Sequence, residues 1–110
     1  MESERVLLTE KLELAEKMLE HVRQSWENGF QTHVDVVHAN IFALEVKLEL
    51  ATFKDERIRL YEQMVALFGV HNEILRKMSG MGRGSPLDLW QSRIEQIDVE
   101  IKLAREKEAK

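Results

Sequence analysis

The sequence contains no cysteine, one proline and five glycines in 110 residues. The absence of cysteine excludes disulfides, thiolate catalysis and metal sites that need a cysteine ligand. Aromatic residues make up only 6% of the chain, a low share for an all-β fold. Every apolar run is much shorter than the roughly 20 residues of a membrane span, and the first residues show no signal-peptide pattern. We therefore expect no membrane insertion.

Positive charge is also scarce, since 16 Lys and Arg stand against 20 Asp and Glu for a net charge of −4. A general nucleic-acid binder needs a net basic face that displaces counterions from phosphate, so we expect no nucleic-acid partner. The acidic residues alternate with lysines at helical spacing, which is typical of solvated helix faces. No motif of a nucleophile, a phosphate-binding loop or a di-iron bundle is present. We expect no catalytic residues, no metal site and no cofactor.

The spacing of the apolar residues predicts helices, because steps of three and four residues keep one helix face apolar. Two such segments lie in the first half of the chain: Leu8, Leu12, Ala15, Leu19, Val22, Trp26; and Val34, Val37, Ile41, Leu44, Leu48, Ala51. Two more lie in the second half: Tyr61, Val65, Phe68, Asn72, Leu75; and Leu87, Trp90, Ile94, Ile97, Ile101, Ala104. Leu7, Leu14 and Met18 widen the first apolar face. We predict four helices with these residues in the core.

Glycines and capping residues mark the breaks between these helices. Asn28-Gly29 predicts the end of the first helix, because glycine adopts the left-handed conformation without a steric penalty. Thr32, followed three residues later by Asp35, predicts a capping box at the start of the second helix. The same Thr-x-x-acid spacing at Thr52 predicts a break and a cap there, although one continuous helix remains an alternative.

The third break follows Gly80, where two further glycines precede Ser85 and Pro86. Serine is a favoured N-cap residue, and proline is favoured in the first turn of a helix because its missing N–H has no partner there. The fourth helix should therefore begin at this Ser-Pro pair.

The second half of the chain repeats the first at an offset of 53 residues, without a gap. Matched pairs include Gly29 with Gly82, Asp35 with Asp88, Ile41 with Ile94, Val46 with Val99, and Leu50 with Leu103. The chain thus consists of two copies of a helix–turn–helix hairpin, at about residues 4–51 and 55–108.

Two such hairpins predict an all-α fold, an antiparallel up-down-up-down four-helix bundle that forms a single domain over residues 1–110. The alternative is that the hairpins open and exchange between two chains. Trp90 is expected to be a large anchor in the core or near a hairpin tip. Asn72 falls on a core position, where it would fix the helix register, and Gly69 lies within the third helix.

Trp26-x-x-Gly29 and Thr32, followed by Asp35-Val36-Val37-x-Ala39, resemble a pattern of the TolC-like outer-membrane efflux proteins. In that family the pattern marks the periplasmic tip of a long coiled-coil hairpin, and each chain carries two hairpins. The second copy is similar through Gly82, Ser85 and Asp88-Leu89, but Ser79 replaces the aromatic residue and Ser92 the alanine. The resemblance covers about residues 5–51 well and 57–108 more loosely.

The chain lacks the β-strands that build the family's membrane barrel, so the resemblance implies the helical module alone. It also implies an origin in the bacterial cell envelope, although no export signal is visible. For function it implies a non-enzymatic interaction or scaffold module that docks to a protein through helical tips. The candidate contact residues are Asn28, Gly29, Phe30, Gln31 and Thr32. The alternative is that these residues only turn the chain, with Phe30 folded back against the helices.

Two other function classes stay open. One is a small helical bundle that senses a ligand or a metal, either through the region of His33, Asp35 and His38 or in a cavity between the hairpins. The two histidines are five residues apart and so point to different sides of a helix, whereas helical zinc pairs are four apart. The other is a subunit that self-associates through a residual apolar stripe.

Overall fold

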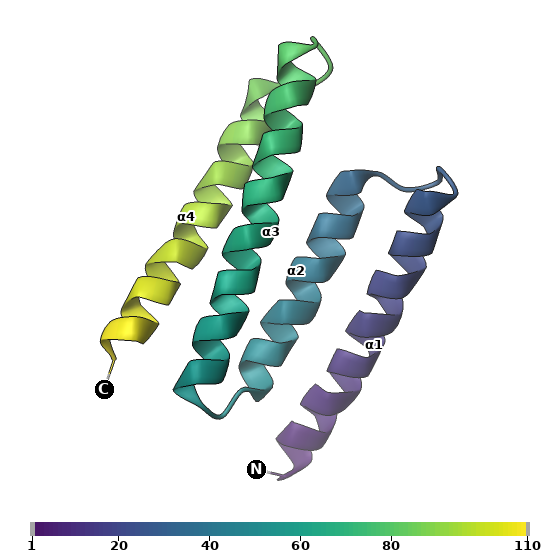
Figure 1. The fold of residues 1–110 in the computed structure, drawn as a ribbon. Helices are drawn as coiled ribbons and strands as arrows, with labels where there is room; N and C mark the ends of the chain where they lie inside the picture. The colour runs from purple at the N-terminus through teal and green to yellow at the C-terminus, as the bar shows by residue number, and fades with distance from the viewer. Residues whose placement is uncertain (1, 110) are drawn as a thin grey trace. The chain divides into compact units, whose positions relative to one another are not determined.

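The computed structural model describes residues 2–109, which form four α-helices and no strand (Figure 1). The helices are α1 Glu2–Glu27, α2 His33–Leu50, α3 Lys54–Gly80 and α4 Pro86–Glu108. The predicted all-α class with four helices is confirmed. The chain divides after Phe53 into two compact units, hairpin 1 (α1 and α2) and hairpin 2 (α3 and α4). The joining of the two hairpins into one up-down-up-down bundle stays a prediction.

Glycine ends the first helix of hairpin 1 as predicted. Gly29 has φ +81°, a conformation that residues with a Cβ rarely adopt. Its N–H donates to the Trp26 carbonyl at 3.0 Å, and the N–H of Phe30 donates to the Ser25 carbonyl at 2.7 Å. This pair of hydrogen bonds is a Schellman motif, which satisfies carbonyls at the helix end.

Hairpin 2 repeats this motif 53 residues later. Gly82 has φ +72° and its N–H donates to the Ser79 carbonyl at 3.0 Å. The N–H of Arg83 donates to the Met78 carbonyl at 2.8 Å. The internal repeat seen in the sequence is therefore also a repeat of backbone structure at both tips.

Both second helices begin with the predicted caps. The Thr32 side chain accepts from the Asp35 N–H at 3.2 Å, and the Asp35 carboxylate accepts from the Thr32 N–H at 3.1 Å. The Ser85 hydroxyl oxygen accepts from the Leu87 N–H at 3.1 Å, with Pro86 in the first turn. These bonds satisfy backbone donors that a helix start otherwise leaves to water.

The break near Thr52 is confirmed, but the cap predicted there is wrong. Helix α2 ends at Leu50 with Ala51 as its C-cap, and α3 begins at Lys54. The residue just before α3 is Phe53, so Thr52 lies one residue outside the position from which a threonine caps a helix. Spacing alone did not place the helix start to within one residue.

Small side chains hold hairpin 1 together. Ala15 of α1 packs with Ala43 and Val46 of α2 in a buried cluster, and Leu12 covers its edge. Alanine at the contact lets two helix backbones approach closely, and Val46 is the largest side chain that is fully buried.

Hairpin 2 places a polar cluster at the corresponding contact. Asn72 of α3 donates to the side-chain carbonyl of Gln96 at 2.8 Å and accepts a hydrogen bond from Ser92. The Gln96 amide donates to the Val65 carbonyl at 3.2 Å, and Asn72 and Ser92 are both buried. The repeat equivalents of Asn72 and Ser92 in hairpin 1 are Leu19 and Ala39, so one copy replaces apolar contacts with hydrogen bonds. The placement of Asn72 in the core is confirmed.

The predicted core residues of α1, α2 and α3 are buried or half-buried except Trp26, which is 46% exposed, so the prediction for Trp26 is wrong. The prediction also fails for α4. Its predicted core residues are all exposed: Leu87, Trp90, Ile94, Ile97, Ile101 and Ala104. Trp90, expected as an anchor, is 59% exposed. Three residues expected to widen the apolar face of α1 are also exposed: Leu7, Leu14 and Met18.

Helix α4 contacts α3 through its opposite side. The residues there are buried or half-buried and follow one another by four and three positions: Ser92, Gln96, Val99, Leu103 and Glu106. Arg57 of α3 donates to the Glu106 carboxylate at 2.7 Å, and Lys54 donates to the Lys107 carbonyl at 3.3 Å. This face of α4 combines Val99 and Leu103 with three polar residues, for which Asn72 and Arg57 of α3 offer partners.

Replacing Gly69 with alanine is expected to stabilise the protein by about 0.5–1 kcal/mol, because glycine is a poor helix former. A Cβ at this position would lie 3.7 Å from the Gln96 amide nitrogen, an ordinary contact. Urea unfolding followed by circular dichroism measures the change. Gly29→Ala is the control and should destabilise the protein. An alanine there would be strained by the positive φ of residue 29, even though no atom lies close to the added Cβ. Two changes of the same sign would contradict this account of both glycines.

Candidate interaction surfaces

The five tip residues predicted to contact a partner, Asn28 to Thr32, are all exposed in the structure. Phe30 is 82% exposed, so the alternative in which its ring folds back against the helices is wrong. The two backbone hydrogen bonds of the turn and the capping box on its far side fix the backbone that presents this ring. An apolar ring held in water on an ordered loop is a typical anchor for a protein interface.

The two tips share a backbone but differ in side chains. At the position of Phe30, hairpin 2 carries Arg83, and at the position of Gln31 it carries Gly84. The tip of hairpin 1 therefore presents an aromatic ring, whereas the tip of hairpin 2 presents a guanidinium beside the exposed Met81. An exposed aromatic ring at the centre of the turn is therefore a feature of hairpin 1, because Arg83 stands at the equivalent position of hairpin 2.

The possible metal ligands near this tip are occupied in other ways or point apart. The ring of His33 is half-buried, with its centroid 6.4 Å from that of Trp26. The Asp35 carboxylate accepts the Thr32 N–H in the capping box, and His38 is exposed on α2. Among residues 2–109 the structure brings together no group of three or more His, Asp or Glu side chains that could hold a metal ion.

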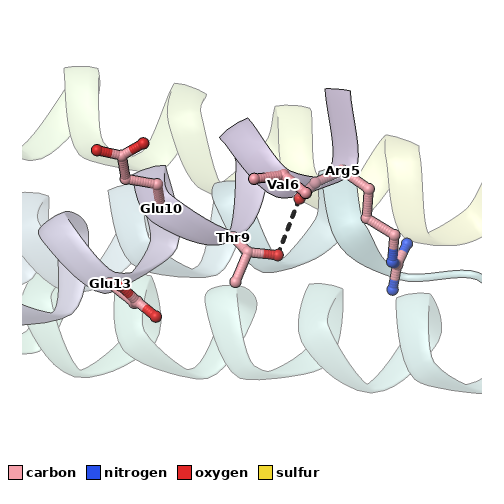
Figure 2. Close-up of a pocket in the computed structure, with 5 residues that line it drawn as sticks. All are labelled: Arg5, Val6, Thr9, Glu10 and Glu13. Atoms are coloured by element: carbon pink, nitrogen blue, oxygen red, sulfur yellow. Dashed lines mark hydrogen bonds between the residues drawn. The ribbon is translucent and has the colours of Figure 1, made fainter. Parts of the chain in front are cut away.

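A shallow depression of about 580 Å³ lies on α1, lined by Arg5, Val6, Thr9, Glu10 and Glu13 (Figure 2). The Thr9 hydroxyl donates to the Arg5 carbonyl at 2.9 Å, and the Arg5 guanidinium donates to the Leu50 carbonyl at 3.3 Å. Figure 2 shows the Glu10 carboxylate pointing away from both Thr9 and Arg5. The depression is open to solvent and its lining carries charges of both signs, from Arg5 and from Glu10 and Glu13.

A second exposed surface lies on α4, at residues predicted to be in the core. The apolar face of α4 consists of Leu87, Trp90, Ile94, Ile97 and Ile101, spaced by three, four, three and four residues. One signal could have revealed it: Ser92 and Gln96 replace Ala39 and Ala43 of the first copy, and Asn72 replaces Leu19. Polar residues at equivalent positions on both helices of a hairpin can satisfy one another in the contact.

In comparisons with known proteins, no family model, no curated protein and no solved structure matches this chain. In the described part of the chain, none of the helices combines the length and the apolar character that crossing a membrane requires.

Proposed function

We propose that this protein is a non-enzymatic helical interaction module and that a protein partner docks on the tip of hairpin 1. The observation that carries the proposal is the exposure of Phe30 on a turn whose backbone is held by four hydrogen bonds. A rigid loop loses little conformational entropy on binding, so most of the apolar contact contributes to affinity. The similarity of Trp26, Gly29, Thr32 and the residues after Asp35 to the tip pattern of TolC-like proteins supports the same surface.

The ring of Phe30 sets the chemistry of the partner. An aromatic side chain that projects from a narrow two-helix tip fits a concave apolar pocket, and the neighbouring Asn28 and Gln31 side chains offer amide hydrogen bonds at its rim. We expect the partner to present such a pocket between helices or at a loop cluster, and not a flat charged surface.

Replacing Phe30 with alanine should reduce recovery of the partner about tenfold or more, as expected when an aromatic anchor worth at least 1.4 kcal/mol is lost. The measurement is quantitative capture on the immobilised chain, followed by affinity determination with the recovered protein. Circular dichroism should be unchanged, because the ring makes no contribution to the folded core.

Phe53→Ala is the matched control, since Phe53 is 72% exposed and lies in the connection between the hairpins. A partner that docks on the tip of hairpin 1 should bind the Phe53→Ala variant with the same affinity as the wild type. Equal losses for the two phenylalanine variants, or no loss for Phe30→Ala, would exclude the tip as the docking surface.

A further inference from the structure

The turn of hairpin 1 contains an asparagine followed by a glycine, Asn28-Gly29. Asparagine is a chemically labile residue, because the backbone nitrogen of the next residue can attack its side-chain Cγ. A Cβ on that next residue crowds the attacking nitrogen, whereas glycine leaves it open and lets the backbone rotate freely. The reacting atoms belong to one dipeptide, so this chemistry does not depend on what either hairpin packs against.

The other asparagines of the chain lie in surroundings that oppose the same reaction. Asn40 precedes the β-branched Ile41 within α2. Asn72 precedes Glu73 within α3. In both cases a side chain crowds the attacking nitrogen, and the helix holds the backbone in one conformation. The reaction should therefore be selective for Asn28.

The turn itself does not require an asparagine. At the equivalent position hairpin 2 carries Met81, followed by Gly82 with φ +72° and the same type of backbone hydrogen bond. Methionine has no amide and still serves this backbone. The labile pair is thus a property of the side chain at residue 28 and not a demand of the fold.

The turn also restrains the reaction. The N–H of Gly29 donates to the Trp26 carbonyl at 3.0 Å. To attack, this nitrogen must give up its proton and reach bonding distance of the Asn28 Cγ. The rotation about the Cα–C bond of Asn28 that brings the two atoms together turns the N–H away from the carbonyl, so the hydrogen bond must open first. Helix ends open at a much lower free energy than a core does, and the turn therefore slows the reaction without preventing it.

We propose that Asn28 is a site of spontaneous deamidation whose rate is set by the opening of the Schellman motif of hairpin 1. The Gly29 nitrogen forms a bond to Cγ, the bond from Cγ to the amide nitrogen breaks, and ammonia leaves with the proton that Gly29 gave up. A water molecule then opens the resulting cyclic imide at either carbonyl, which yields aspartate or isoaspartate. The reaction needs no oxidant and no enzyme. This inference does not rest on docking at the tip of hairpin 1.

The product alters the end of α1. In isoaspartate the main chain runs through the Cβ and Cγ of residue 28, so it is longer by one carbon before Gly29. Both N–H donors of the Schellman motif are then displaced from their carbonyls, Trp26 and Ser25. The new carboxylate also places a negative charge at a helix C-terminus, where the helix dipole is already negative. The last turn of α1 should fray, and the backbone that presents Phe30 should lose its order.

Incubation of the purified protein in mildly alkaline buffer, with and without concentrated urea, tests the proposal. Peptide mapping by mass spectrometry locates the modified residue, and labelling with an isoaspartyl methyltransferase separates isoaspartate from aspartate. In both conditions the product should form at Asn28 before Asn40 or Asn72. The folded protein should react about 10 to 100 times more slowly than the unfolded chain, because only the open turn is reactive.

Asn28→Gln is the matched control, because it keeps the amide but would have to form a less favourable six-membered ring. This variant should stay unmodified while the wild type reacts. Hydrogen exchange at the Gly29 and Phe30 amides should become faster in the aged wild type and stay unchanged in the aged variant.

Equal rates in buffer and in urea would overturn the proposed control by the turn. A folded protein that stays intact at Asn28 after about 100 half-lives of the unfolded chain would overturn the site itself. Unchanged exchange at Gly29 and Phe30 in the isolated isoaspartate form would contradict the expected fraying.

Discussion

Replacing Phe68 with alanine is expected to lower the free energy of unfolding of hairpin 2 by about 3–5 kcal/mol, the largest effect of any single truncation in this chain. Phe68 is only 4% exposed and lies one helical turn before Asn72 on α3. Its repeat equivalent in hairpin 1 is Ala15, a buried residue in a cluster of small side chains. Hairpin 2 therefore places an aromatic ring at a buried position where hairpin 1 has only a methyl group.

Urea unfolding followed by circular dichroism measures this loss, and it should appear as a transition at lower urea concentration. Phe53→Ala and Phe30→Ala serve as controls, because both rings are exposed and their removal leaves no cavity. A loss below about 1 kcal/mol for Phe68→Ala would mean that the surrounding side chains collapse into the vacated space.

Replacing Asn72 with leucine is expected to destabilise hairpin 2 by about 1–3 kcal/mol, although leucine occupies the equivalent position in hairpin 1. The substitution removes the acceptor of the buried Ser92 hydroxyl and the donor to the Gln96 carbonyl. The cost thus comes from polar groups left behind in the contact between α3 and α4. It does not come from any preference of the helix for asparagine.

The double variant Asn72→Leu/Ser92→Ala tests this origin, because it restores the apolar pair Leu19 and Ala39 of hairpin 1. Gln96 keeps Arg93 at 2.8 Å and the Val65 carbonyl as partners. The double variant should therefore lose less than about 1 kcal/mol, which is less than Asn72→Leu alone. The single variant Ser92→Ala completes the comparison. If the loss in the double variant equals the sum of the losses in the two single variants, as measured by urea unfolding, the hydrogen bond between Asn72 and Ser92 makes no contribution to stability.

Most of the local structure could be predicted from the sequence, because it depends on residues close together in the chain. Gly29 and Gly82 end α1 and α3 through their own backbone conformation, and Ser85 with Pro86 starts α4 within a single turn. The tip candidates also belong to this group: a five-residue loop could be placed, with Phe30 among one glycine and three polar residues, but the exposure of its ring could not. That exposure depends on where the flanking helices point.

The choice of the contact face on α4 could not be predicted. Helical periodicity shows that Leu87, Trp90, Ile94, Ile97 and Ile101 share a side, but it does not show which neighbour, if any, covers that side. The hydrogen-bonding groups on α3 determine which face of α4 lies in the contact. Asn72 satisfies Ser92 and Gln96, and Arg57 satisfies Glu106, so a mostly polar face of α4 is buried without leaving unpaired groups.

The sequence by itself determined the four helices, their glycine turns, the N-caps of α2 and α4 and the 53-residue repeat, since each follows from hydrogen bonds and backbone preferences within a few residues. Only the tertiary structure decided that the two copies build their helix contacts from different chemistry, apolar around Val46 and polar around Asn72. The physical reason is that a buried polar side chain is tolerated only when a partner from another helix reaches it, and that partner lies 20 or more residues away along the chain.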